Sequence, residues 1–466
     1  MHETETIPSG RPASRGRVAI AGAGLAGTLT ACLLAARGWR VDVFERRPDP
    51  RRHGDSGGRS INLALATRGI HALRAARLDI ETMRHTVAMR GRMVHVAGSF
   101  PQLHPYGRDP QDVIWSIHRG RLNRLLLDAA ERAGACVHHG GAVEHVDCRT
   151  RELILSSGRR ARFDLLIGAD GADSRVRAAL AHTADLGIDC ERQPHGYKEL
   201  EIPATADGGF RLEPHALHLW PRGGYMCIAL PNTEGSFTTT LFLPVDSSDH
   251  DDRDTPSFAS LPNGRAARRL FERVFPDLSP HVPALEADFD THPVGTLGTL
   301  RLQRWHAHGH TVLLGDAAHA MVPFHGQGMN CALEDAVALV RQLDAHPHER
   351  AAALAAFEAE RRPNALAIQA MALENYVEMR ARVATPGYAL ERELSAWLAE
   401  RHPERFVPRY SMVTFQRVPY TLAYERGKIQ ADILRAGTAG CDTFQQIDLR
   451  AVERDLRDRL PVLSAA

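Results

Sequence analysis

The sequence predicts an α/β protein in which a parallel sheet with flanking helices carries an inserted antiparallel sheet and is followed by a helical region. Three observations predict this fold class. Within Arg17–Gly27 a short apolar run meets glycines, and a helical segment, Thr28–Arg37, and an alternating strand, Arg40–Glu45, follow; together they make a β-α-β unit. Four strand-like runs follow one another between residues 196 and 245, as in an antiparallel sheet. From about residue 330 the pattern is mostly helical.

The first element carries a glycine-rich turn of the Rossmann type. Gly22, Gly24 and Gly27 follow the first strand and open the first helix. Gly22 allows a tight turn, Gly24 lets the backbone approach a pyrophosphate, and Gly27 lets helix and strand pack closely. Glu45, at the end of the second strand, can accept hydrogen bonds from ribose hydroxyls. The alternative is a tight turn without a ligand, and at this point NAD and FAD both remain open.

The later elements follow from the same periodicities. A helix is predicted over Arg119–Ala133, and a long helical region over Asn330–Arg382 with a break near Pro347. Strands are predicted at Ala135–Val146, Arg151–Ser156, Phe163–Gly168 and Thr311–Leu314, and those of the inserted sheet at Tyr197–Ile202, Ala216–Trp220, Tyr225–Leu230 and Ser236–Val245. Strands typical of a parallel sheet occur both before and after the inserted antiparallel strands, so we expect the first domain to be discontinuous in sequence.

These elements predict a division of the chain into four parts. Residues 1–15 are expected to be a disordered lead-in. Residues 16–80, 107–190 and 300–345 are assigned to the dinucleotide-binding domain, residues 81–106 and 191–299 to a substrate-binding sheet domain, and residues 346–466 to a C-terminal helical domain.

Composition excludes several classes of function. The 57 Lys and Arg residues balance 56 Asp and Glu residues, for a net charge of +1, so nucleic acid and acidic membrane surfaces are not expected partners. No apolar run is long enough to span a membrane, and the polar first fifteen residues lack a signal-peptide core. The seven cysteines form no C-x-x-C pair and the 25 histidines form no H-E-x-x-H motif. We therefore expect a cytoplasmic protein without disulfides or a metal site.

Two further motifs favour FAD. Leu165–Arg177 places Asp170-Gly171 after a buried strand, and Val312–His319 places Gly315-Asp316 in a similar position. With the first glycine motif, they resemble the fingerprints of the class A aromatic hydroxylase flavoproteins, the group that includes hydroxybenzoate hydroxylase. The resemblance implies that Asp316 binds the FAD ribityl chain and that Arg119 lies along FAD. The chain has no second glycine-rich unit, which fits this group, and the resemblance implies that NADPH docks transiently as a co-substrate.

The aspartates of these motifs also allow a simpler interpretation, in which each caps a helix. We assign that role to Asp173 and Asp335, and assign Asp170 and Asp316 to FAD. The resemblance also implies that the helix beginning near Asn330 directs its N-terminus to the flavin pyrimidine, where a partial positive charge favours the reduced, anionic flavin.

Longer segments narrow the resemblance. They are Gly58–Leu65, Met89–His95, Pro105–Gly107, Pro194–Leu200, Leu217–Pro221, Phe324–Asn330, Glu374–Met379 and Arg409–Phe415. They resemble the kynurenine 3-monooxygenase family, bacterial type, from about residue 17 to 430. The resemblance implies hydroxylation of L-kynurenine at the 3-position by NADPH and O2 through a flavin C4a-hydroperoxide. Mitochondrial members have a membrane-anchoring C-terminal helix, whereas here the tail, Ala451–Ala466, is short and charged, so we expect no membrane attachment. The expected oligomeric state is a monomer or homodimer.

The same resemblance implies the site residues. Arg92, Tyr106, Asn375 and Tyr410 would hold the amino-acid end of the substrate, since a guanidinium matches a carboxylate. From the bare sequence, Arg92 would be taken for a surface arginine and the tyrosines for core or turn residues. The aromatic ring would lie against Leu217, Met226, Ile228, Leu230 and Phe242, with Pro323, Phe324 and His325 on the flavin side. Alternation places Met226, Ile228 and Leu230 on one face of a strand.

The predicted cofactor-binding residues come from all three fingerprints and their flanks: Gly22, Gly24, Ala26, Gly27, Glu45, Arg46, Ala64, Arg119, Val143, Asp170, Val176, Asp316, Gly328, Met329 and Asn330. No general base is assigned, because the aniline nitrogen of kynurenine itself activates the ring carbon beside it.

Three other functions are compatible with part of this pattern. A hydroxylase of the same class could act on a phenolic acid, which has no ammonium group to hold. A flavin halogenase would carry a Gly-Trp-x-Trp-x-Ile-Pro segment, which the sequence lacks. A non-catalytic FAD-fold binding protein would purify colourless.

Overall fold

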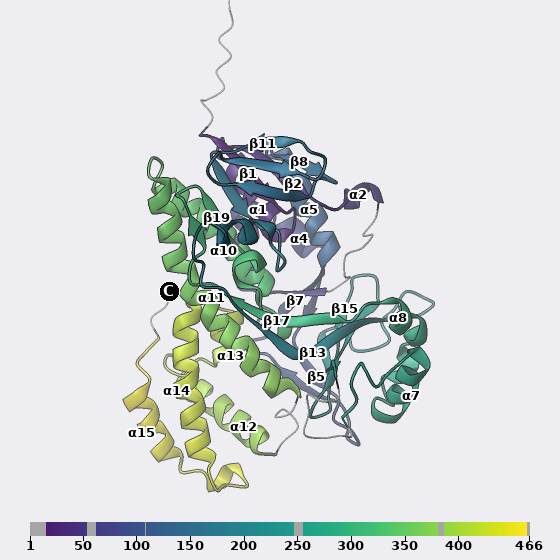
Figure 1. The fold of residues 1–466 in the computed structure, drawn as a ribbon. Coiled ribbons are helices and arrows are strands. Elements are labelled where there is room, and N and C mark those ends of the chain that lie inside the picture. Colours follow the sequence, from purple (N-terminus) through teal and green to yellow (C-terminus); the bar gives the residue numbers. More distant parts are fainter. Residues whose placement is uncertain (1–14, 54–61, 108, 247–254, 381–385, 464–466) are drawn as a thin grey trace, which may run out of the picture.

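The computed structural model describes residues 15–53, 62–107, 109–246, 255–380 and 386–463. The expected lead-in, residues 1–15, therefore lies outside the described residues except for Arg15. One end of the molecule holds a six-stranded sheet with its helices, the other a seven-stranded sheet, and the C-terminal helices lie along one side of both (Figure 1).

The six-stranded sheet is the predicted parallel sheet. Its order is β18 (His306–Ala307), β19 (Thr311–Leu313), β12 (Leu165–Gly168), β1 (Arg17–Ala21), β2 (Arg40–Glu45) and β8 (Cys136–His139). All pairs are parallel except β18 with β19. The predictions for β1 and β2 are confirmed, and the glycine-rich turn leads into α1 (Leu25–Ala35) three residues earlier than expected.

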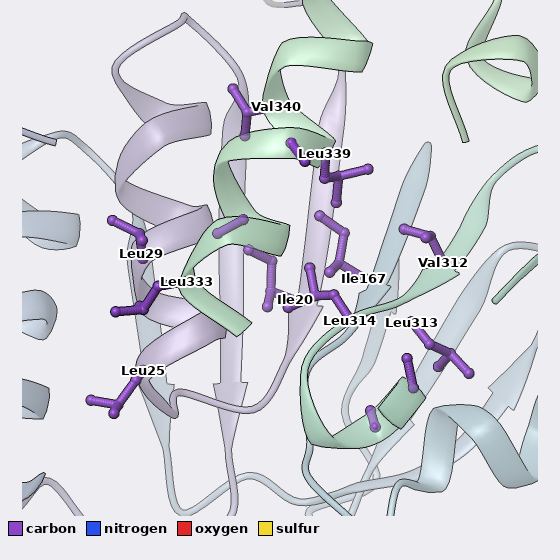
Figure 2. Packing of buried hydrophobic residues seen from close by; sticks show 14 of the residues in the cluster. Ile20, Leu25, Leu29, Ile167, Val312, Leu313, Leu314, Leu333, Leu339 and Val340 are labelled. Atoms are coloured by element: carbon purple, nitrogen blue, oxygen red, sulfur yellow. The ribbon is translucent and has the colours of Figure 1, made fainter. Parts of the chain in front are cut away.

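Helix α10 (Gly328–Ala345) lies beside α1 over this sheet (Figure 2). Leu29 of α1 and Leu333 and Leu339 of α10 are fully buried in the same cluster as Ile20 and Ile167 of the strands. Burying one such side chain contributes about 1.5–3 kcal/mol. The two helices whose N-termini face the expected cofactor are thus fixed on one sheet by a shared apolar core.

One strand prediction in this region is wrong. Ala135–Val146 was expected to form a single strand, but the chain turns at Gly140, where φ is +72°. The first half becomes β8 in the six-stranded sheet, and the second half becomes β9 (Val143–Asp147), which pairs with β10 (Glu152–Leu155) and, through it, β11 (Arg160–Arg162). A further three-stranded sheet joins β3 (Asn62–Leu65), β7 (Ile114–His118) and β4 (Thr86–Met89).

The seven-stranded sheet contains the inserted strands. Its order is β17 (Gly295–Arg301), β13 (Asp189–Ile202), β16 (Phe237–Pro244), β15 (Met226–Pro231), β14 (Ala216–Pro221), β5 (Gly91–Val94) and β6 (Gln102–Pro105). The four predicted strands are antiparallel neighbours, as expected. The exception to the antiparallel pattern is the parallel pairing of β14 with β5, which sets Leu217 opposite Arg92.

The two faces of this sheet have different neighbours. One face packs on α7 (Gly264–Val274) and α8 (Leu285–Thr291), near η2 (Ser279–His281), and buries Trp220, Cys227 and Leu241 with Phe271. The side chains that alternate with these, including Met226 and Phe242, pack against Phe324 and Tyr376 instead. The second face therefore looks toward the six-stranded sheet and the C-terminal helices.

The C-terminal region is helical, as predicted. Its helices are α11 (Arg350–Arg380), which contains Pro363, α12 (Pro386–Arg401), α13 (Arg409–Thr414), α14 (Tyr420–Thr438), η5 (Phe444–Gln446) and α15 (Leu449–Arg459). The expected break near Pro347 is confirmed as the gap between α10 and α11. None of the helices in the described residues has the length and apolar character needed to cross a membrane.

The remaining helices are α2 (Pro50–His53), α3 (Thr67–Ala75), α4 (Asp79–Met83), α5 (Arg119–Arg132), α6 (Arg175–Ala181), α9 (Asp316–His319) and the 3-10 turn η3 (Pro323–His325). Helix α5 confirms the predicted helix, and the helices that follow β12 and β19 stand where the second and third fingerprints were expected.

Candidate active site

The three fingerprint loops lie together at one edge of the six-stranded sheet. Ala21 of β1 is paired with Gly168 of β12, and Gly168 with Leu313 of β19. Because these strands are parallel, the loops that follow them leave the sheet on the same side. In open α/β sheets, ligands bind at the carboxyl ends of the strands.

Each glycine of the first loop is required for a different steric reason. A Cβ on Gly22, whose φ is +98°, would lie 2.4 Å from Ala169 O, and one on Gly27 would lie 2.1 Å from Gly22 O. Neither position admits a side chain. A Cβ on Gly24 would meet no atom within 4 Å, so the backbone there borders open space. That is the arrangement a bound pyrophosphate requires.

Glu45 is buried behind this loop. Its Oε2 accepts a hydrogen bond from Ala23 N at 2.9 Å, and its Oε1 accepts one from Arg47 N at 3.0 Å. Burial by itself raises the pKa of this carboxyl, but the hydrogen bonds from Ala23 and Arg47 hold the pKa below its ordinary value. Glu45 is therefore an ionised acceptor, which suits the ribose hydroxyls of a dinucleotide.

The two aspartates assigned to FAD differ in their surroundings. Asp316 is exposed at the start of α9, and its carboxylate has no hydrogen-bonding partner among the described residues. Asp170 Oδ2 accepts hydrogen bonds from Arg175 N at 2.7 Å and Val176 N at 3.2 Å and so caps α6, while its Oδ1 accepts from Ser174 Oγ at 2.5 Å. The geometry thus leaves Asp316 free for a ligand and engages Asp170 in the capping role.

The capping role expected for Asp335 is wrong. Asp335 lies inside α10 and is fully buried. Its Oδ2 accepts hydrogen bonds from Gly315 N at 3.1 Å and His319 Nε2 at 2.5 Å, and its Oδ1 from Arg361 Nε at 2.8 Å. Asp335 therefore holds the third fingerprint loop from behind.

The predicted cofactor residues at the start of α10 lie against β3. Asn330 is fully buried; its Oδ1 accepts from Ala66 N, and its Nδ2 donates to Ala64 O at 2.8 Å and Gly326 O at 2.9 Å. Its side chain thus ties β3 to the turn before α10. Gly328 and Met329 are partly exposed at the helix N-terminus, where backbone N–H groups have no helical acceptor.

The other predicted cofactor residues fall into two groups. Arg46 follows β2 and Arg119 opens α5, and both are exposed. Val143 and Val176 are buried in the main core, so only their backbone could face a ligand. Ala26 faces the third loop, since a Cβ on Gly315 would lie 3.4 Å from the Ala26 Cβ.

The predicted substrate residues Arg92, Tyr106 and Tyr410 are brought together from three parts of the chain. Arg92 lies on β5, Tyr106 follows β6, and Tyr410 lies on α13. The Tyr106 and Tyr410 rings stack with centroids 5.4 Å apart, and the Arg92 Cζ lies 5.1 Å from the Tyr410 ring centroid. His325 stacks on Tyr410 with centroids 5.3 Å apart. These side chains form the polar end of the candidate site.

This polar end contains buried atoms without partners. Within the described part of the chain, Tyr106 Oη and His325 Nδ1 have no hydrogen bond. Burial lowers the pKa of His325 to about 3, assisted by Arg409 and Arg92, so its imidazole is neutral. The carboxylate near Arg92 is that of Glu378, 4.0 Å from Nη1. Buried unsatisfied groups are rare in native proteins, so a polar ligand is expected here.

Asn375 and Phe324 shape the adjoining wall. Asn375 Nδ2 donates to Phe324 O at 2.5 Å, so its donor is engaged with η3. The Phe324 ring stacks on Tyr376 with centroids 3.9 Å apart and lies 5.0 Å from Phe242. Pro323 is exposed at the first position of η3.

The apolar wall links the substrate residues to the cofactor side. Leu230 is buried with Met89 and Ile114, and partly buried side chains pack on this cluster: Ala64, Tyr106, Leu217, Ile228, Tyr410 and Phe415. Ala64 belongs to the predicted cofactor residues, and Tyr106, Leu217, Ile228 and Tyr410 belong to the predicted substrate residues. Met226 and Phe242 pack in the neighbouring cluster with Phe324. The predicted apolar face thus adjoins both halves of the site.

Sequence reasoning missed several residues here. Glu378 and Tyr376 lie in the segment Glu374–Met379, which was noticed without assigning them a role. Tyr388, on α12, donates from its Oη to Glu378 Oε1 at 2.7 Å, and no local sequence pattern predicts this contact. His104 lies on β6; burial, together with Arg392 and Arg92, lowers its pKa to about 4.

Comparison with known proteins identifies the family. The sequence matches the family described as FAD binding domain over residues 15–372. A Stenotrophomonas maltophilia (strain K279a) protein named kynurenine 3-monooxygenase is 54% identical over 454 residues, 96% of this chain and 98% of that protein. A Xanthomonas axonopodis pv. citri (strain 306) protein of the same name is 53% identical over 460 residues, 98% of this chain and 99% of that protein. The chain belongs to the kynurenine 3-monooxygenase family.

Solved structures of other oxygenases have the same fold as this chain. One of 2-methyl-3-hydroxypyridine-5-carboxylic acid oxygenase has a TM-score of 0.65 at 22% identity and covers 81% of this chain and 95% of that one. One of P. aeruginosa PqsL in complex with 2-aminobenzoylacetate has a TM-score of 0.63 at 25% identity and covers 79% and 97%. The resemblance inferred from the motifs is confirmed, and a phenolic-acid hydroxylase or a non-catalytic binder is not favoured.

Proposed function

We propose that this chain hydroxylates L-kynurenine at the 3-position, with FAD as its bound cofactor. The reaction joins L-kynurenine, NADPH, a proton and O2 to give 3-hydroxy-L-kynurenine, NADP+ and water. One oxygen atom enters the ring and the other leaves as water, with the two electrons taken from NADPH. The observation that carries the proposal is the group of polar atoms without partners beside Arg92, next to the loops that fit a dinucleotide.

Arg92 is proposed to bind the substrate carboxylate. Its side chain is 12% exposed, and a guanidinium held away from water forms strong charge-assisted bonds with a carboxylate. Tyr106 and Tyr410 flank it with their rings stacked, and their phenols can complete the polar contacts. Glu378 offers an acceptor for the substrate ammonium on the same side. Asn375 contributes by holding the Phe324 carbonyl.

The apolar face is proposed to orient the ring. Leu217, Met226, Ile228, Leu230 and Phe242 would hold the 2-aminobenzoyl group against the flavin side, where Pro323, Phe324 and His325 stand. The PqsL structure supports the binding of such a group in this fold, because the 2-aminobenzoylacetate in that complex has the same 2-aminobenzoyl group as kynurenine. A wall of this kind also keeps water from the reacting atoms.

The cofactor is proposed to lie across the three fingerprint loops. Gly24 leaves room for the pyrophosphate, Glu45 accepts from the ribose, and Asp316 has a free carboxylate for the ribityl hydroxyls. The other residues assigned to FAD are Ala26, Arg46, Ala64, Arg119 and the start of α10. Asp170 is proposed to contribute by holding the second fingerprint loop against α6, since its carboxylate is engaged there. FAD bound there supplies the activation of O2 once NADPH has reduced it.

No side chain is assigned as a general base. The amino group of kynurenine donates electrons to the ring carbon that becomes hydroxylated, so the ring is activated by the substrate itself. His325 is neutral, since burial lowers its pKa to about 3, and it can exchange a hydrogen bond without placing a charge beside the ring.

The test is product analysis of the purified yellow protein. With NADPH, O2 and L-kynurenine, we expect a product heavier by one oxygen atom and NADPH oxidation matched to its formation. Salicylate and 4-hydroxybenzoate serve as competing substrates. NADPH oxidation coupled to either of them, with kynurenine unchanged, would refute the substrate. A protein that purifies colourless and cannot be reconstituted with FAD would refute the cofactor.

The broader assignments are proposals of the same kind. The domain division is supported by the joining of β5 and β6 with β13 to β17 in one sheet. All seven cysteines are free thiols, which supports a reducing compartment, the cytoplasm. We propose a monomer or homodimer without a nucleic-acid partner.

A further inference from the structure

A chain of buried charged side chains begins behind the third fingerprint loop. Asp335 accepts from Gly315 N at 3.1 Å and so fixes the residue that precedes Asp316. Gly315 has a φ of +59°, in the left-handed region, so the loop depends on contacts of this kind. The carboxylate also accepts from His319 Nε2 at 2.5 Å, which ties both ends of α9 to one side chain.

The charge of Asp335 is balanced inside the protein. Arg361 of α11 donates from Nε to Asp335 Oδ1 at 2.8 Å, and its Nη2 lies 3.3 Å from Glu334 Oε2. Burial alone raises the pKa of Asp335, but His319 and Arg361 hold it at about 2. Asp335 is therefore ionised, and Arg361 joins it to the neighbouring carboxylate, Glu334.

Glu334 also forms an ion pair with a second buried arginine, Arg68. Its Oε1 lies 3.3 Å from Arg68 Nη1, on α3. Arg68 is 2% exposed although it carries a full charge. Buried charges are costly unless they are paired and hydrogen-bonded, so the other donors of Arg68 must also be satisfied.

Those donors bind the segment that carries Tyr410. Arg68 Nε donates to Val413 O at 2.8 Å, and Nη2 donates to Met412 O at 3.4 Å and to Val418 O. Met412 and Val413 stand two and three residues after Tyr410, within α13. Three carbonyls of α13 and the turn after it are thus held by one guanidinium.

Tyr420 adds a second link from Arg68 back to the site. The Arg68 Cζ lies 4.0 Å from the Tyr420 ring centroid, and Tyr420 Oη donates to Gln327 Oε1 at 2.9 Å. Gln327 directly precedes α10 and stands two residues after His325, which stacks on Tyr410. The network therefore contacts the substrate side at two points.

We propose that Arg68, Glu334, Arg361 and Asp335 form a positioning network that couples the flavin-binding Gly315-Asp316 loop to the substrate-binding Tyr410. The chain runs without a break from Gly315 N to Met412 O, through two carboxylates and two guanidiniums. Packed networks with discrete arrangements transmit coupling between sites. Its members touch neither ligand, so they act by holding residues that do; the proposal rests on the proposed function for the identity of the substrate.

The test is a double-mutant cycle on the holoenzyme, with kynurenine binding followed by the change in flavin absorbance without NADPH. We expect Arg68→Met and Asp335→Asn each to raise the kynurenine Kd about tenfold. Because either change alone breaks the chain, the rise in Kd of the double variant should be smaller, by about threefold or more, than the product of the two single rises. Asp335→Asn should also raise the FAD Kd, measured by the fluorescence of released flavin. Effects that multiply would overturn the proposal.

Two further variants keep the test decisive. Glu334→Gln neutralises the central link while preserving its shape; if the other variants do not fold, it alone should raise the kynurenine Kd, and a wild-type Kd would refute the coupling. Arg74→Gln, on α3 like Arg68, removes an exposed ion pair with Asp79 and should leave both Kd values unchanged. If the wild-type flavin spectrum does not respond to kynurenine, the proposed function fails, and the FAD arm still shows whether Asp335 holds the loop.

Discussion

Arg90 and Arg92 are neighbours on the chain but have different environments. Arg90 is exposed, whereas the Arg92 side chain is 12% exposed and lies against two tyrosine rings. A charge in that position is useful when an anion approaches it, because electrostatic attraction strengthens as water is excluded. The pair therefore offers a matched comparison at the scale of single residues.

Arg92→Ala should raise the kynurenine KM by about thirtyfold, since losing one partner of a buried charge pair costs about 2 kcal/mol or more. Because the substrate would be held loosely, part of the NADPH should be consumed to give hydrogen peroxide. Steady-state kinetics with peroxide measurement checks both effects. Arg90→Ala is the control and should behave like the wild type. Normal KM and normal coupling in Arg92→Ala would remove Arg92 from the site.

Gly24 separates the needs of the fold from those of the cofactor. An added Cβ there meets no protein atom within 4 Å, so Gly24→Val should leave the melting temperature of the FAD-free protein within about 2 °C of the wild type. The same side chain would occupy space assigned to the pyrophosphate, and the FAD Kd should rise by at least about tenfold. Flavin fluorescence and thermal melting measure the two quantities. Unchanged FAD affinity would contradict the assigned path of the cofactor.

At the scale of elements, the β5–β6 hairpin determines where Arg92 and Tyr106 stand. Gly91 is paired with Pro105, and a Cβ on Gly91 would lie 2.4 Å from His104 O. A side chain at this position would push the two strands apart. The positions of Arg92 and Tyr106, the two proposed substrate-binding residues of the hairpin, thus depend on the absence of a Cβ at Gly91.

Gly91→Val should raise the kynurenine KM by about tenfold or more, because displacements near 1 Å cost rate and affinity at positioned groups. The FAD Kd should stay close to the wild-type value, since the hairpin lies in the other sheet. Gly98→Asn, at the hairpin turn, is the control: a Cβ there would meet no atom within 4 Å, and asparagine tolerates the φ of +75° at this position. It should leave KM unchanged. A rise in KM with Gly98→Asn as large as that with Gly91→Val would indicate general loosening of the hairpin.

The elements also show what the sequence reveals and what it hides. β2 was predicted with its correct bounds, and β1 at its correct place before the glycines, because their apolar pattern is strong and local. The first half of β13, which begins at Asp189, reads as a polar loop, yet it pairs with β17. The parallel contact of β14 with β5 joins residues more than 120 positions apart, and no local pattern encodes it. Gly140 was overlooked as a turn, so two strands were merged into one.

At the scale of the whole molecule, buried histidines make stability depend on pH. Burial lowers the pKa of His325 to about 3 and that of His218 to about 4, whereas unfolded histidines titrate near 6.5. Between these values the unfolded chain binds more protons than the folded one, so stability is full above about pH 6.5 and falls as the pH drops below it. The two histidines lie on η3 and β14, so acid weakens both sides of the seven-stranded sheet.

His325→Phe should reduce this acid sensitivity. Phenylalanine can keep the stack on Tyr410 and removes the titrating group, so the loss of stability between pH 7.5 and 5.5 should be smaller by about 1 kcal/mol. Thermal melting with excess FAD at the two pH values measures the difference. His348→Gln, at an exposed position, should show the wild-type loss. The same loss in His325→Phe would contradict the buried, neutral state of His325.

The candidate site was predictable in part. The spacing and context of the glycines and Glu45 predict a dinucleotide site. Arg92, Tyr106 and Tyr410 were predicted as site residues from segments shared with the family. Asp335 was misjudged, because an aspartate within a helical stretch gives no sign that it will be buried against a loop twenty positions earlier. Glu378, Tyr388 and Arg68 act through partners that meet only in the folded chain.

Tyr410 comes late in the chain, and the order of synthesis gives this a consequence. A nascent polypeptide possesses every strand of the six-stranded sheet and all of α10 once residue 345 has emerged, but α13 begins only at Arg409. Domains generally fold as they leave the ribosome, from the N-terminus onward. The growing protein can therefore form the loops assigned to FAD before the segment that carries Tyr410, and translation that stops short of α13 yields a chain without this proposed substrate-binding tyrosine.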